Sequence, residues 1–352
     1  MKLRGVALFL IVILLLSGCR SQETGGVSAT PGGIPWPTKD WQTSKPEKQG
    51  MNSAVLDEMQ AVIEKEDINL HSLLIIRHGV IVSETYYHPY QQDTQHQMFS
   101  VTKSFIGTLV GMAVDQGKLK LDDPVADIVG GEALENLDEQ KQTMTVRDLL
   151  TMTSGLDWQE GDPTYMKMYR SRDWVKMVMD LPMVHQPGEE FRYCSGCSHV
   201  LSGILQRISG MDTESFARQY LLAPLGIKNY EWEKDSQGIA LGGWGLNITP
   251  RDMGKLGYLY LHNGQWEGKQ ILSTDWVKAS TTKQIDADGR LDYGYQWWIY
   301  DTHGAYAALG RDGQTIWVSP ELDLIVVTTA QIDGHDPIWR LIDDYVIKAV
   351  NE

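Results

Sequence analysis

The sequence predicts an α+β protein in which one antiparallel sheet is built from both ends of the chain, with a helical region inserted between them. Three observations support this fold class. Two β-rich runs flank a His78-Gly79 turn near the start, four strand-like runs lie between residues 293 and 329, and most helical patterns fall between these two groups. A length of 352 residues suffices for one large domain or two ordinary ones.

The first 48 residues are not expected to belong to the folded body. Lys2 and Arg4 precede an apolar run over 6–16, which is too short to span a bilayer comfortably and is typical of a signal-peptide core. The run ends in Leu16-Ser17-Gly18-Cys19, which resembles the bacterial lipobox. We therefore expect a signal peptide over 1–18, lipidation of Cys19, and export to the outer face of the bacterial cell membrane. The alternative is an ordinary signal peptide that happens to contain a cysteine.

Residues 19–48 are rich in Ser, Thr, Gly and Pro, and such a segment buries too little apolar surface to order itself. We expect a flexible tether there, followed by a single folded domain over 49–352.

The folded domain begins with a helix that Ser53 caps and that runs to about Glu66, with apolar residues on one face. A hairpin of strands over 72–77 and 80–86 follows. The segment 101–116 is apolar nearly all round and is therefore predicted to be a buried helix. The remaining expectations are helices over 145–152 and 198–208, a helix opened by Thr249-Pro250, strands over 293–299, 304–309, 315–318 and 322–329, and a final helix over 337–350.

Charge and cysteine content exclude several classes of function. The formal net charge of −15 argues against nonspecific binding to nucleic acid, which needs a basic surface. Three cysteines are too few for a disulfide framework, and without a histidine cluster we expect neither a metal nor a cofactor. The Cys194-Ser195-Gly196-Cys197 segment has three interpretations: a redox pair, half of a metal site, or small residues that open a helix. We place the packing role first and a disulfide second.

Ser100-Val101-Thr102-Lys103 is an S-x-x-K motif at the start of the predicted buried helix. Residues i and i+3 share a helix face, so Lys103 reaches the Ser100 hydroxyl, and apolar surroundings disfavour its charged form. The pair therefore suits a nucleophile and its base. The alternative is an N-cap serine followed by a lysine that extends to solvent. Ser280 and Lys283 form a second match, but no buried helix follows them.

Two further segments carry polar groups suited to the same chemistry. Tyr193 follows a Pro187-Gly188 turn and precedes a helix, where it could move a proton to a leaving group; the alternative is a core tyrosine. Gly310 and Arg311 lie in a tight turn between two strands, where a backbone N–H could pair with that of Ser100 to hold an oxyanion; the alternative is a plain hairpin turn.

These motifs, in this order, resemble the serine β-lactamase-related hydrolases, which include penicillin-recognising D-amino-acid peptidases, β-lactamases, carboxylesterases and nylon-oligomer amidases. The resemblance extends roughly from His71 to the C-terminus and is also carried by the segments 99–103, 117–119, 121–125, 149–156 and 249–253. It implies the following roles: Ser100 as acyl-forming nucleophile, Lys103 as its base, Tyr193 as proton shuttle, the backbone N–H groups of Ser100 and Arg311 as oxyanion donors, and Ser195, Gly310 and Arg311 as substrate-binding positions.

Two departures from the family pattern bear on the substrate. Ser195 stands where asparagine is common, which is associated with the esterase and nylon-oligomer amidase branch, and Ala308 stands where lysine or histidine is common. We therefore expect a serine hydrolase that acts through an acyl-enzyme on a small ester, amide or peptide-like substrate, and whose contact with a membrane is through the lipid anchor only. Arg311 is an alternative source of the missing charge. Alternative functions are a β-lactamase or D-amino-acid peptidase, a non-turnover acylating sensor, and a degenerate scaffold.

Overall fold

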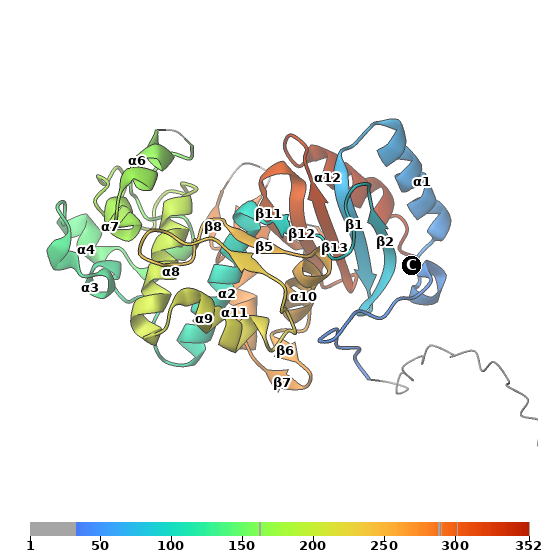
Figure 1. Cartoon of the computed structure of the whole chain (residues 1–352), viewed down its shortest axis with the longest axis horizontal. Helices are drawn as coiled ribbons and strands as arrows, with labels where there is room; N and C mark the ends of the chain where they lie inside the picture. Colours follow the sequence, from blue (N-terminus) through green and yellow to red (C-terminus); the bar gives the residue numbers. More distant parts are fainter. Residues whose placement is uncertain (1–32, 162, 288, 290, 301, 352) are drawn as a thin grey trace, which may run out of the picture. The chain divides into compact units, whose positions relative to one another are not determined.

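The computed structural model describes residues 33–351 except 162, 288, 290 and 301, and the described chain from Pro35 onward forms one compact unit. The expected signal peptide and Cys19 lie outside the described residues. Within the described part, the main element is an antiparallel sheet of eight strands (Figure 1). Its spatial order is β2 (Val80–Tyr86), β1 (Leu70–Arg77), β13 (Leu324–Ala330), β12 (Gln314–Ser319), β11 (Tyr306–Gly310), β10 (Trp298–Ile299), β9 (Asp292–Tyr293) and β8 (Ile285–Asp286).

The sheet joins the two ends of the compact unit, as the sequence predicts. β1 pairs with β13 in a register that places Ile75 opposite Val326. The β1–β2 hairpin closes through His78 and Gly79, which both have positive φ angles, at 50° and 74°. Positive φ at both central residues is the geometry that suits the right-handed twist of a tight hairpin. The α+β fold class is therefore confirmed.

The helical region is inserted between β2 and β8, and most of its helices gather at one end of the unit (Figure 1). Its helices are α2 (Thr102–Asp115), α3 (Val125–Val129), α4 (Glu139–Thr143), α5 (Val146–Leu150), α6 (Thr164–Arg170), α7 (Trp174–Met179), α8 (Ser195–Ser209), α9 (Thr213–Ala217), α10 (Pro250–Leu261) and α11 (Thr274–Ser280). Short strands β3 (His96–Gln97), β5 (Leu246–Ile248) and β4 (Glu231–Trp232) form one small sheet, and β6 (Gln265–Trp266) and β7 (Lys269–Gln270) form another.

Both faces of the main sheet are covered. Leu73 and Ile75 pack in a cluster with α1 (Ser53–Lys65) and α12 (Asp336–Leu341), whereas Leu74 and Ile76 pack in a second cluster with α2 and α10. Successive side chains of a strand point to opposite faces, so the continuous apolar run of β1 supplies both clusters.

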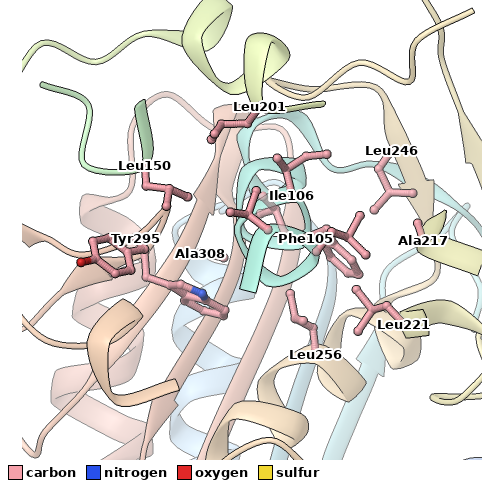
Figure 2. Packing of buried hydrophobic residues seen from close by; sticks show 14 of the residues in the cluster. Phe105, Ile106, Leu150, Leu201, Ala217, Leu221, Leu246, Leu256, Tyr295 and Ala308 are labelled. Atoms are coloured by element: carbon pink, nitrogen blue, oxygen red, sulfur yellow. The ribbon is translucent and has the colours of Figure 1, made fainter. Parts of the chain in front are cut away.

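Helix α2 lies at the centre of the second cluster, surrounded by side chains from α5, α8, α10 and β11 (Figure 2). Every residue from Thr102 to Ala113 is buried. Gly111 allows this close packing, because a Cβ there would lie 2.4 Å from the Trp276 indole nitrogen. The buried helix predicted over 101–116 is confirmed, and it anchors the segment that carries Ser100.

The tether predicted over 19–48 ends earlier than expected. Trp41 is buried, and its indole nitrogen donates to the Arg251 carbonyl at 2.9 Å, while the Ser44 and Ile81 backbones are linked at 2.9 Å. Arg251 also forms an ion pair with Asp40. The folded unit therefore begins at Pro35 rather than at 49, because two tryptophans within a Ser/Pro-rich stretch, Trp36 and Trp41, pack on the core.

Three element predictions need smaller corrections. Asn52, not Ser53, caps α1 by accepting from the Ala54 N–H at 3.0 Å. The single strand predicted over 293–299 is two short strands, because Gln296 adopts a φ of 62° and turns the chain between them. The helix predicted over 337–350 is α12 followed by a wider π-helical turn, Ile342–Val346.

Candidate active site

Ser100 lies on a tight 3-10 turn, Phe99–Val101, directly before α2. Phe99 has a φ of 45°, a conformation that costs energy for a residue with a side chain and that often occurs at functional sites. The turn leaves Ser100 half-buried in the wall of a cleft of about 430 Å³. The serine is therefore accessible, while the helix that follows it is fully packed.

Lys103 is 1% exposed and donates three hydrogen bonds: to the Ser100 Oγ at 2.9 Å, the Ser195 Oγ at 2.9 Å and the Gly243 carbonyl at 2.7 Å. Burial lowers its pKa to about 8, and the Glu160 carboxylate opposes that fall. This geometry rules out the alternative of an N-cap serine followed by a lysine that extends to solvent. Lys103 is buried, and the N-cap residue of α2 is Val101, which makes no side-chain capping hydrogen bond.

Tyr193 and Ser195 are brought to the same place by the start of α8, which begins three residues earlier than the helix predicted from residue 198. The Lys103 Nζ lies over the Tyr193 ring, 4.8 Å from its centroid. Burial raises the pKa of Tyr193, and a hydrogen bond with Ser100 works against that rise. Tyr193 is therefore a protonated phenol beside the Ser100 hydroxyl, which is the state that a proton donor requires.

A disulfide closes the N-terminal turn of α8. Cys194 and Cys197 are bonded, and the Cys194 backbone N–H donates to the Met152 sulfur at 3.3 Å. The small residues open α8, as the interpretation placed first predicts: Ser195 and Gly196 are buried in its first turn, and a Cβ at Gly196 would lie 2.5 Å from the Trp158 ring. The disulfide placed second is also present. Because Tyr193 and Ser195 flank Cys194, the bridge fixes the backbone that carries both.

Glu160 is the functional candidate that the sequence did not reveal. Its carboxylate accepts from the Ser195 N–H at 2.6 Å, the Ser195 hydroxyl at 3.1 Å, the Trp158 indole at 2.7 Å and the Tyr165 hydroxyl. Ser195 in turn accepts from Lys103, so a hydrogen-bonded chain runs from Glu160 to Ser100. Glu160 lies in the loop before α6, where no periodic pattern marks it.

Gly310 ends strand β11 next to the Phe99–Val101 turn that carries Ser100. A Cβ at Gly310 would lie 2.4 Å from the Met98 carbonyl oxygen, so only glycine allows this strand to approach the turn so closely. Gly310 therefore has two roles: it is expected from the sequence to leave room for substrate at the strand edge, and it allows β11 to approach the turn. Arg311 is exposed, lines the same cleft as Ser100, and places its guanidinium 5.7 Å from the centre of the Phe99 ring.

The second S-x-x-K match has no such setting. Ser280 is fully buried at the end of α11, where its hydroxyl donates to the carbonyls of Trp276 and Val277. Lys283 is largely exposed and pairs with Asp286 and Asp292 instead. The structure thus separates the two matches as the sequence context predicts. Among the residues described, no group of three or more His, Cys, Asp or Glu side chains is placed to hold a metal ion.

The sequence and the fold are those of a known family. The family model described as Beta-lactamase matches residues 57–351, and the chain belongs to this family. The chain is 25% identical over 285 residues to the 6-aminohexanoate-dimer hydrolase of Paenarthrobacter ureafaciens, which covers 74% of this chain and 72% of that protein.

Solved structures share the fold. A putative 6-aminohexanoate-dimer hydrolase from Bacillus anthracis superposes with a TM-score of 0.72 at 21% identity, covering 82% of this chain and 80% of that one. A family VIII carboxylesterase superposes with a TM-score of 0.70 at 16% identity, covering 84% and 96%.

Proposed function

We propose that the protein is a serine hydrolase that acts through an acyl-enzyme on small esters or amides. The observation that carries this proposal is the 2.9 Å hydrogen bond between the buried Lys103 Nζ and the Ser100 Oγ, together with a Lys103 pKa of about 8. A lysine with such a pKa is partly neutral near physiological pH and can accept the serine proton. The names of the relatives, a 6-aminohexanoate-dimer hydrolase and a carboxylesterase, agree with this chemistry.

The cycle has two halves. In acylation, Lys103 takes the proton of Ser100 while the Ser100 oxygen bonds to the substrate carbonyl carbon, and the backbone N–H groups of Ser100 and Arg311 bind the oxyanion. Collapse breaks the bond to the leaving group, which receives a proton from Tyr193 as Lys103 reprotonates Tyr193. In deacylation, water attacks the ester carbonyl, loses a proton to the same groups, and releases the acid and Ser100.

Burst kinetics with a nitrophenyl ester test this proposal. We expect a burst equal to the enzyme concentration, then steady turnover, and neither phase in Ser100→Ala. A burst without turnover indicates an acylating sensor instead. The absence of both burst and adduct in the wild type indicates a degenerate scaffold and contradicts the proposal.

The expected substrate preference favours esters and linear amides over β-lactams. Ala308, which is buried in β11, supplies no charge to hold a substrate carboxylate. One charge-assisted hydrogen bond contributes about 1.5–3 kcal/mol, or roughly ten- to a hundredfold in rate if it forms in the transition state. We expect kcat/KM to be higher for a nitrophenyl ester than for a cephalosporin. If the wild type instead prefers the cephalosporin and Arg311→Ala removes that preference, Arg311 binds the substrate carboxylate. That result would contradict the expected preference for esters.

We also propose that the mature protein is exported and attached to the membrane by lipid on Cys19, on the basis of the Leu16-Ser17-Gly18-Cys19 junction. The described residues include no helix of the length and apolarity that a membrane span requires. Cys19→Ala is expected to release the protein from the membrane fraction. A wild-type protein that is wholly soluble and begins after another cleavage site contradicts this proposal.

A further inference from the structure

A buried histidine–aspartate pair contacts the chain segment that holds Lys103. His199, one helical turn after Ser195 in α8, is 1% exposed, and the Asp235 side chain is fully buried. The His199 Nε2 lies 3.1 Å from the Asp235 Oδ2. Removing a carboxylate from water costs free energy unless its oxygens are hydrogen-bonded. Neither side chain lines the cleft, so the proposed cycle leaves this buried pair without a role.

The segment 240–243 connects this pair to the base. The Gly243 carbonyl accepts from the Lys103 Nζ at 2.7 Å, the shortest of the three hydrogen bonds that this lysine donates. The residue before it, Gly242, donates its backbone N–H to the His199 Nδ1 at 3.4 Å. One ring therefore lies between a buried carboxylate and the backbone that supplies an acceptor to Lys103.

Two glycines allow the 240–243 segment to lie directly on the first turns of α8. A Cβ at Gly242 would lie 2.0 Å from the Ser198 carbonyl oxygen, and a Cβ at Gly243 would lie 2.6 Å from the Ser195 carbonyl oxygen. Both distances are far shorter than ordinary contacts, so only glycine fits at either position. A small displacement of this backbone therefore moves the Gly243 carbonyl relative to α8 and Lys103.

The contacts of His199 assign its tautomer. A backbone N–H can only donate, so Gly242 requires the lone pair of Nδ1, and the ring proton is on Nε2, where it is donated to Asp235. The other oxygen of Asp235, Oδ1, accepts from the Gln237 and Ile239 N–H groups at 2.8 and 2.9 Å. These bonds fix the carboxylate, and the carboxylate in turn fixes the orientation of the imidazole.

We propose that His199 and Asp235 are positioning residues, which hold the 240–243 segment where the Gly243 carbonyl can accept from Lys103. This inference rests on the proposed acyl-enzyme function, in which Lys103 is the base. Neither residue is catalytic, because both act through the backbone of Gly242 and Gly243.

The position of the Gly243 carbonyl affects the titration of Lys103. A carbonyl that accepts from an ammonium group stabilises its charged form, so withdrawing this carbonyl should lower the pKa of Lys103 below about 8. The titratable groups that face Lys103 are Glu160 and Tyr193, and neither contacts the His199–Asp235 pair. A change in this pair therefore reaches Lys103 through the 240–243 segment.

Asp235→Asn tests the tautomer. The amide oxygen is expected to keep the bonds from Gln237 and Ile239, so the amide NH2 faces His199 and requires a lone pair on Nε2. The ring proton then moves to Nδ1, against the Gly242 N–H. With a nitrophenyl ester we expect kcat to fall roughly fivefold to thirtyfold, and the rise of kcat/KM near pH 8 to move to lower pH.

Two variants of His199 separate positioning from stability. The oxygen of an asparagine lies near the place of Nδ1, and the amide nitrogen of a glutamine lies near the place of Nε2. His199→Asn therefore keeps the acceptor for Gly242, His199→Gln keeps the donor to Asp235, and both lose the ring that packs 5.4 Å from Trp174. We expect His199→Asn to stay within about threefold of the wild-type kcat with the wild-type pH profile, whereas His199→Gln should match Asp235→Asn.

Ser202→Ala is the matched control. Its hydroxyl is also buried on α8 and donates to the Ala240 carbonyl of the same segment at 2.6 Å, but it does not contact Gly242 or Gly243. We expect this variant to lose stability and to keep the wild-type kcat and pH profile. All kinetics are measured below the thermal unfolding midpoint of each variant, so that loss of folded protein does not enter kcat.

The outcomes separate this inference from the proposed function. Equal losses of kcat in His199→Asn and His199→Gln with an unchanged pH profile show that the pair only stabilises the fold, and they overturn the inference. A wild-type kcat and pH profile in folded Asp235→Asn overturns it as well, while the hydrolase function stands. If Asp235→Asn does not fold, the two His199 variants decide. If the wild type forms no Ser100 adduct, the proposed function fails, and the inference fails with it.

Discussion

Gly310→Ala tests whether the approach of strand β11 to the Phe99–Val101 turn sets the proposed catalytic geometry. The added Cβ would lie 2.4 Å from the Met98 carbonyl oxygen, whereas ordinary contacts begin near 3.4 Å, so the strand or the turn must move by about 1 Å. A misplacement of that size costs on the order of a hundredfold in rate, because in the proposed cycle the Ser100 oxygen and the Arg311 N–H must both reach the same substrate carbonyl. The overpacking itself costs about 1–3 kcal/mol of stability.

The assay is kcat/KM for a nitrophenyl ester, measured well below the thermal unfolding midpoint of each variant. Gly257→Ala is the control, since its Cβ would lie 3.0 Å from the Ile316 side chain in the core, away from the cleft. We expect Gly257→Ala to lose stability but stay within about twofold of wild-type activity. A Gly310→Ala protein that is folded and fully active would refute the geometric argument.

The remaining predictions concern the hydrogen-bonded chain behind Ser100. Because Lys103 must be neutral to act as a base, kcat/KM should rise with pH through about 8. Glu160 raises the Lys103 pKa, so Glu160→Gln should move that limb to lower pH; an unchanged or upward-shifted pH profile would contradict this coupling. Ser195→Ala removes one hydrogen-bond acceptor from Lys103, and we expect kcat to fall roughly tenfold to a hundredfold. Ser195→Thr should partly restore kcat. A wild-type kcat in Ser195→Ala would show that the hydrogen-bonded chain from Glu160 to Ser100 does not contribute to catalysis. Replacing Cys194 and Cys197 by alanine should lower the free energy of unfolding by about 2 kcal/mol, which denaturant unfolding measures. The replacement should also reduce kcat, since Tyr193 and Ser195 flank Cys194. An unchanged kcat would show that the bridge only stabilises the fold.

The parts of the site that the sequence predicts are those encoded locally. Ser100 and Lys103 are one helical turn apart, and the apolar run after them identifies a buried helix, so their juxtaposition follows from backbone geometry alone. The hairpin of β1 and β2 is likewise specified by two runs of strand-forming residues on either side of a His78-Gly79 turn. Each of these rests on residues that are close in the sequence.

The parts of the fold and of the site that the sequence does not predict depend on contacts between segments that are distant in the chain. Glu160 reaches Ser195 across 35 positions from a loop without periodicity, and Gly243 meets Lys103 across 140. Trp41 is held in place by Arg251, which no local pattern indicates. Gln296 divides an apparently continuous strand because its buried amide donates to the Leu150 carbonyl, a partner from the inserted helical region. In each case tertiary packing overrides the local pattern.

The central claim is that Ser100 is the nucleophile, and mass spectrometry after treatment with a fluorophosphonate tests it most directly. The account predicts one adduct per chain, located on the peptide that contains Ser100, absent from Ser100→Ala and retained in Ser280→Ala. Lys103→Met should slow its formation strongly, because the serine then lacks its base. An adduct that persists in Ser100→Ala, or that maps to Ser195 or Ser280 in the wild type, would contradict the account.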